Sequence, residues 1–117
     1  MENREHDDED GRLVAAMRLG ERAALAALYD RYASLLVAVA ARILGDGREA
    51  EDLVHDVMLE AWRSAGDYAP ARGTVRSWLL VRLRPLALDR KRSVSASRVS
   101  AVDPDWLHAL PAPAEPP

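Results

Sequence analysis

The chain has 117 residues, of which 49% are hydrophobic and 30% charged, and its formal net charge at pH 7 is −3. This length suits one domain of about 100 residues with short tails, and the absence of cysteine excludes disulfides, thiolate zinc sites and thiol catalysis. The sequence has no uninterrupted run of about 18 apolar residues, and its acidic start is not that of a secretory signal. We therefore expect a cytoplasmic protein without membrane insertion.

The charges are distributed unevenly along the chain. Residues 1–10 carry six acids and one arginine, whereas residues 72–98 carry eight basic residues and one acid, Asp89. A basic cluster of this kind favours contact with nucleic acid, although a solvated basic helix face would have the same composition.

The residue pattern in the first half of the chain predicts a tail and two helices. Residues 1–10 are acidic and almost without apolar side chains, so we expect a disordered tail. A helical pattern begins at Gly11 and stops near Gly20. From about residue 21 to 44, apolar side chains recur at steps of three and four, which predicts a second helix with one apolar face.

A third helix is expected over residues 47–64, with Asp46 as its N-cap. Its apolar stripe consists of Ala50, Leu53, Val54, Val57, Ala61 and Trp62. The opposite face carries Asp52, His55, Asp56, Leu59 and Glu60. Three loop-forming residues, Gly66, Pro70 and Gly73, then mark a loop that contains Tyr68.

A fourth helix is expected over residues 75–92, capped by Thr74. Residues 94–117 are first serine-rich and then proline-rich, a composition typical of a linker or tail. No segment shows a strand pattern. The sequence therefore predicts an all-α fold, a compact bundle of about four helices over residues 11–93.

Several segments resemble region 2 of extracytoplasmic-function sigma factors. The segment EDLVHDVMLEAW (51–62) is similar to an acidic helix of that family. The segment YAPARGTVRSWLL (68–80), continued by ALDRKR (87–92), is similar to its aromatic-Asp-Pro-x-Arg-Gly loop and following Trp-Leu-Leu helix. Residues 12–21 and 28–32 resemble the first two helices. The pieces occur in the family's order.

The resemblance implies that the third helix binds the clamp helices of the β′ subunit of RNA polymerase core. Carboxylates beside an apolar side chain on one helix face can pair with arginines and bury a central hydrophobic contact. A solvated acidic face remains the alternative. The implied polymerase-binding residues are Asp52, Leu53, His55, Asp56, Leu59 and Glu60. His55 takes the place of the usual glutamine and can still donate and accept a hydrogen bond.

The resemblance also implies that the loop and the fourth helix melt the −10 promoter element and capture a base of the non-template strand. Such capture needs phosphate neutralisation, a stacking side chain and a pocket. The implied DNA-binding residues are Tyr68, Arg72, Thr74, Arg76, Arg84, Arg90, Lys91 and Arg92. Tyr68 is either a stacking residue or an aromatic plug beneath the loop, and Trp78 is expected in the core.

Two features depart from the family. Pro85 stands where asparagine is frequent, and proline in a helix interior removes a donor and favours a kink. Either the fourth helix bends near 81–85 or promoter reading differs. In addition, nothing after residue 93 suggests the family's second domain, which reads the −35 element, so we expect a fragment or a single-domain variant.

Two other functions remain as alternatives. The first is a sigma-like interaction module, or decoy, that binds an anti-sigma factor or the polymerase without promoter activity. The second is an enzyme, because His55, Asp56 and Glu60 superficially resemble part of a metal site. The remaining histidines, His6 and His108, fall in the expected tails, so three converging ligands are not expected. We expect no catalysis, no metal and no cofactor.

Overall fold

The computed structural model describes the backbone of residues 2–100 and the side chains of residues 4–93. Within residues 2–100 the chain forms four α-helices and no strand, which confirms the predicted all-α bundle. The elements in chain order are α1 (Glu2–Arg18), α2 (Arg22–Leu44), α3 (Gly47–Arg63), the 3₁₀ turns η1 (Ala65–Asp67) and η2 (Pro70–Arg72), and α4 (Val75–Ser100).

Capping residues fix the helix boundaries where the sequence predicts them. Gly45 ends α2 in the left-handed conformation (φ 75°), and its N–H donates to the Ala41 carbonyl at 2.7 Å. The Asp46 carboxylate then accepts a hydrogen bond from the Arg48 backbone N–H at 2.8 Å. At the start of α4, the Thr74 hydroxyl accepts one from the Ser77 N–H at 3.1 Å. Each cap satisfies backbone groups that a helix end leaves without partners.

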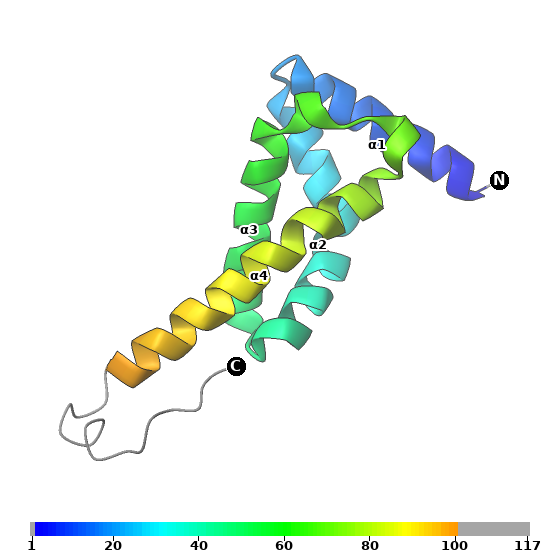
Figure 1. Cartoon of the computed structure of the whole chain (residues 1–117). Coiled ribbons are helices and arrows are strands. Elements are labelled where there is room, and N and C mark those ends of the chain that lie inside the picture. Colours follow the sequence, from blue (N-terminus) through cyan, green and yellow to red (C-terminus); the bar gives the residue numbers. More distant parts are fainter. Residues whose placement is uncertain (1, 101–117) are drawn as a thin grey trace.

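Helix α2 is the centre of the bundle and packs against α1, α3 and α4. In Figure 1, α1 crosses the end of the bundle where the segment between α3 and α4 also runs. The largest completely buried side chains are Leu28, Leu36, Leu53, Leu79 and Leu83. Buried alanines lie between them and let the helices approach closely, so a core almost without aromatics still fills its volume.

By length and composition alone, α2 is long and apolar enough to cross a membrane. The core helix of a soluble protein passes the same test. In this chain α2 packs against all three other helices, and Asp30, Arg31 and Arg42 interrupt its apolar run. We therefore describe α2 as a core helix, while the absence of membrane insertion stays a prediction.

The expected disordered tail over residues 1–10 is wrong for residues 2–10, which are the first half of α1. The physical reason is tertiary. The Asp10 side chain is fully buried, and it accepts hydrogen bonds from Arg31 at 2.6 Å and from the Tyr32 hydroxyl. These two hydrogen bonds to a buried carboxylate stabilise the helix although the segment makes few apolar contacts.

Helix α4 is longer than expected, because it continues to Ser100 rather than ending at residue 92. It runs through Pro85 without a break (Figure 1). Because proline has no backbone N–H, the Val81 carbonyl loses its helical donor. Val81 and Pro85 are both exposed, so water can hydrogen-bond to this carbonyl. The linker or tail predicted over residues 94–117 is therefore wrong for residues 94–100, and the rest of it lies outside the described residues.

Candidate functional site

The polar face of α3 points away from the bundle as the sequence predicts. Asp52, His55 and Asp56 are exposed, Leu59 is 48% exposed, and Glu60 is partly buried. We call these five residues the α3 face. Leu53, the sixth predicted polymerase-binding residue, is only 1% exposed. It follows Ala50 by three positions and therefore lies on the core stripe, so its side chain is not available for the predicted contact.

The surface beside the α3 face continues onto α2. The rings of His55 and Tyr29 are stacked, with centroids 5.6 Å apart, and His55 Nε2 lies 3.4 Å from the Tyr29 hydroxyl. Next to them is a mostly apolar cleft of about 430 Å³ that includes Leu25, Met58 and Leu59. The sequence analysis did not select this part of α2, although Tyr29 lies within one of the segments that carry the resemblance.

Arg90 links the two predicted surfaces. Its guanidinium donates to Asp56 at 2.5 Å and to Glu49 at 3.3 Å, so it faces α3. The sequence groups Arg90 with the DNA-binding residues because it lies in the basic cluster. The structure instead places its charge against two carboxylates, where it is less available to a phosphate.

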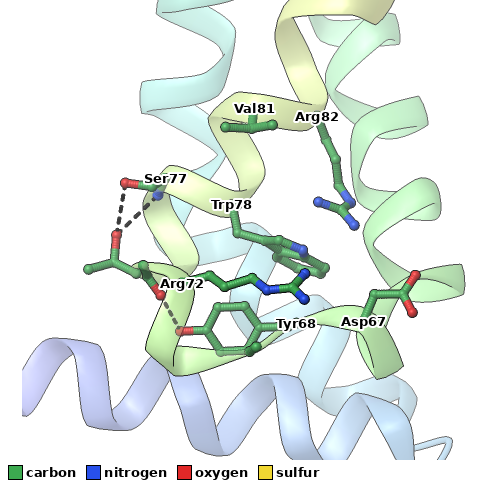
Figure 2. Close-up of a pocket in the computed structure, with 10 residues that line it drawn as sticks. Asp67, Tyr68, Arg72, Ser77, Trp78, Val81 and Arg82 are labelled. Carbon is green, nitrogen blue, oxygen red and sulfur yellow. Dashed lines mark hydrogen bonds between the residues drawn. The ribbon is translucent and has the colours of Figure 1, made fainter.

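Between η1 and the start of α4 lies a pocket of about 250 Å³. We call it the loop pocket. It is lined by Asp67, Tyr68, Ala69, Arg72, Gly73, Thr74, Ser77, Trp78, Val81 and Arg82. Figure 2 shows Arg72, Trp78 and Arg82 among the side chains that line this pocket. Two cations and two aromatic rings thus converge on one opening.

Tyr68 lines this pocket and contacts two of its other lining residues. Its ring meets Trp78 edge-on at a centroid distance of 5.4 Å, and its hydroxyl donates to the Gly73 carbonyl at 3.0 Å (Figure 2). Burial, followed by the charges of Asp7 and Asp10, raises the Tyr68 pKa, so the hydroxyl remains a donor. Of the two interpretations of Tyr68, this geometry favours the plug. Trp78 is partly buried and packs against the core, as predicted.

Arg82 belongs to the pocket although sequence reasoning did not select it. Its guanidinium carbon lies 4.2 Å from the centre of the Trp78 ring, a cation–π contact. Its Nε atom is buried and has no hydrogen-bond partner among the described residues. The signal in the sequence was its spacing of four residues from Trp78, which places both side chains on one side of a helix.

The remaining predicted DNA-binding residues are spread along the loop and α4. Thr74 is partly buried and caps the helix, whereas Arg72, Arg76, Arg84, Lys91 and Arg92 are exposed. Arg84 and Lys91 are seven residues apart and share a helix face with Val81 and Leu88, which are 69% and 41% exposed. Arg92 pairs with Asp89 at 3.4 Å. Only Arg72 and Thr74 of this set line the loop pocket with Tyr68.

Within the part of the chain that the structure describes, no group of three or more His, Cys, Asp or Glu side chains is placed to hold a metal ion. The alternative of an enzyme would have used His55 and Asp56, with Glu60 one turn further on, as metal ligands. In the structure these two side chains engage Tyr29 and Arg90 instead.

Comparison with known proteins identifies the family. Residues 28–97 match the family model for sigma-70 region 2. The chain is 42% identical over 92 residues to the ECF RNA polymerase sigma factor SigK of Mycobacterium sp. (strain KMS), covering 73% of this chain and 48% of the relative.

Two further relatives agree. SigK of Mycobacterium ulcerans is 34% identical over 89 residues, covering 76% of this chain and 48% of that protein. SigL of Mycobacterium tuberculosis (strain H37Rv) is 34% identical over 80 residues, covering 68% and 45%. The chain thus spans about half the length of the curated relatives that it matches. By this family match, in agreement with its helical fold, the chain belongs to the sigma-70 region 2 family and is a region 2 domain of the extracytoplasmic-function type.

Proposed function

We propose that this chain binds RNA polymerase core through the α3 face and opens the −10 element of promoters through the loop pocket and α4. The observation that carries the proposal is the presence of two separate surfaces of different chemistry. The cleft beside the α3 face and the loop pocket share no lining residue. Both partners can therefore be bound at the same time, which transcription initiation in a bacterial cytoplasm requires.

The α3 face suits a basic helical partner such as the β′ clamp helices. Asp52 and Asp56 lie one helical turn apart and both are exposed. Asp52 can pair with an arginine on an opposing helix, whereas Asp56 already accepts from Arg90 and offers only its remaining acceptor sites. Leu59, which lines the cleft between α2 and α3, supplies an apolar centre. An apolar core with a charged rim is the common anatomy of a protein interface.

The loop pocket suits a single nucleic-acid strand. A flipped base can stack on the flat guanidinium of Arg72, which lines the loop pocket. Arg76 and Arg84 lie further along α4, where exposed cations can neutralise phosphates. Pro85 offers no side-chain donor where the family often has asparagine, so base reading in this chain would depend on the loop pocket.

The test separates the two activities. Asp52→Lys should weaken binding to core polymerase by about 1–3 kcal/mol, because it places a cation against a basic partner. The matched control is Asp8→Lys, the same substitution at an exposed position on α1, away from the α3 face and its cleft. Asp52 is a cleaner site than Asp56, whose replacement would also release Arg90. Unchanged polymerase affinity for Asp52→Lys would contradict the proposed interface.

The second activity is measured on a forked promoter duplex. If about six phosphates are contacted, the logarithm of the affinity should fall with the logarithm of salt concentration with a slope of about −4 to −5. Polymerase binding without salt-dependent DNA binding would favour the interaction module instead. Two observations favour that second candidate. Pro85 offers no side-chain donor to a base, and the exposed Val81 and Leu88 on the same helix suit a protein partner such as an anti-sigma factor.

A further inference from the structure

Neither proposed interface uses the acidic residues at the start of α1. We call Glu5, Asp7, Asp8, Glu9 and Asp10 the acidic segment. Asp10 is buried, whereas the other four side chains are exposed or partly exposed. Carboxylates repel phosphates, so the distance of these residues from the proposed DNA-binding surface decides whether they affect DNA binding.

The acidic segment is held in a fixed place on α2. Asp10 accepts hydrogen bonds from Arg31 at 2.6 Å and from the Tyr32 hydroxyl. The other arm of the Arg31 guanidinium reaches His6 Nδ1 at 2.7 Å and the His6 carbonyl at 3.1 Å. These contacts orient the first three turns of α1, including Asp7 and Asp8, relative to the rest of the bundle.

This placement brings the acidic segment beside the loop that forms the loop pocket (Figure 1). Asp7 and Asp8 line one side of a cleft of about 470 Å³, and Arg72, Gly73 and Thr74 belong to its other side. Asp7 also borders a second cleft, of about 490 Å³, together with Arg76 and Ser77. Among the described side chains, no ion pair joins Asp7 or Asp8 to Arg72 or Arg76. The carboxylates thus lie across open clefts from these arginines.

We propose that the acidic segment is an autoinhibitory element that lowers the affinity of the loop and the start of α4 for nucleic-acid phosphates. A phosphate that enters either cleft to reach Arg72 or Arg76 meets the like charge of Asp7 on the opposite wall. Because the segment is anchored by Asp10, the repulsion persists until the carboxylates are neutralised or α1 is displaced. This inference rests on the proposed DNA-binding function.

The test uses the full 117-residue chain and a fluorescently labelled forked duplex with a single-stranded extension. The variant Asp7→Asn with Asp8→Asn should bind about 3- to 10-fold more tightly than the wild type at about 0.05 M salt, and the gain should shrink strongly at about 0.5 M salt. The control variant, Glu21→Gln with Glu51→Gln, removes the same charge from two exposed sites outside both clefts. It should gain much less.

A second pair of variants separates failure of this inference from failure of the proposed function. Arg72→Ala with Arg76→Ala should weaken DNA binding in the wild type and in the Asn variant. If the arginine change weakens binding but the Asn variant gains no more than the control, DNA binding stands and autoinhibition is overturned. If only the Asn variant binds, both are supported. If no variant binds the duplex although circular dichroism shows intact helices, both are overturned.

Discussion

The α3 face and the loop pocket are built in different ways. Every residue of the α3 face lies on one helix, so its exposure follows from helical periodicity once the core stripe is known. The loop pocket combines η1, η2 and the start of α4, and α1 borders the clefts on its other side. A surface on one helix can be read from spacing, whereas a pocket made by several segments depends on how those segments pack.

Arg90 belongs to the basic cluster of the sequence, but it lies at the α3 face and does not line the loop pocket. Its pairs with Glu49 and Asp56 join α4 to α3 on the edge of the α3 face. A change to this arginine is therefore expected to act first on the α3 face, although its place in the basic cluster predicted a DNA-binding role. Four predictions test the core and surface of α3, the contact of α1 with α2, and the basic cluster.

The largest expected effect distinguishes the core from the surface of α3. Leu53→Ala should lower the free energy of unfolding by about 2–5 kcal/mol, because it leaves a cavity in a packed core. Leu59→Ala, at a position 48% exposed, should cost far less stability but weaken polymerase binding. Urea denaturation and a polymerase-binding assay measure the two effects. A stable Leu53→Ala variant that fails to bind polymerase would show that Leu53 contributes to the proposed interface after all.

The next effect concerns the anchor of the acidic segment. Asp10→Ala should lower the free energy of unfolding by about 3 kcal/mol, because it leaves Arg31 without its carboxylate and Tyr32 without its acceptor. Asp8→Ala, one of the exposed acids, is the control and should change stability only slightly. Equal unfolding midpoints for the two variants in urea would show that α1 is not anchored in this way.

Alkaline pH should destabilise the fold through Tyr32. Burial, followed by the hydrogen bond to Asp10, raises its pKa above the ordinary value of 10.0. The unfolded chain therefore loses this proton first, so the stability is full below pH 10 and falls as the pH rises further. One such proton gives a slope of at most about 1.4 kcal/mol per pH unit. Tyr32→Phe should remove more of this slope than Tyr68→Phe, and identical slopes in urea titrations between pH 9 and 11 would refute the assignment.

The smallest effect separates two arginines of the basic cluster. Arg72→Ala should weaken DNA binding and reduce the salt slope by about 1, whereas Arg90→Ala should leave the slope unchanged. The Arg90 pairs are partly exposed, so their loss should cost only about 0–1 kcal/mol of stability. Equal changes in slope would mean that Arg90 leaves α3 when DNA binds.

The sequence determined the helical class, the caps at Asp46 and Thr74, and the exposed face of α3, because each depends on neighbours within a few residues. Local pattern did not reveal that residues 2–10 are helical. Their composition predicts disorder, and only the contact of Asp10 with Arg31 and Tyr32, more than twenty positions away, overrides it.

The tertiary structure alone decided which charges face each other. In the sequence, Arg72, Arg76 and Arg90 are equivalent members of one basic cluster, and the acids at the N-terminus are a separate tail. Packing of the helices sets Arg90 against Asp56 and brings Asp7 beside the clefts that hold Arg72 and Arg76. Coulombic interactions depend on distance in space and not along the chain, so these arrangements of charge exist only once the four helices have assembled.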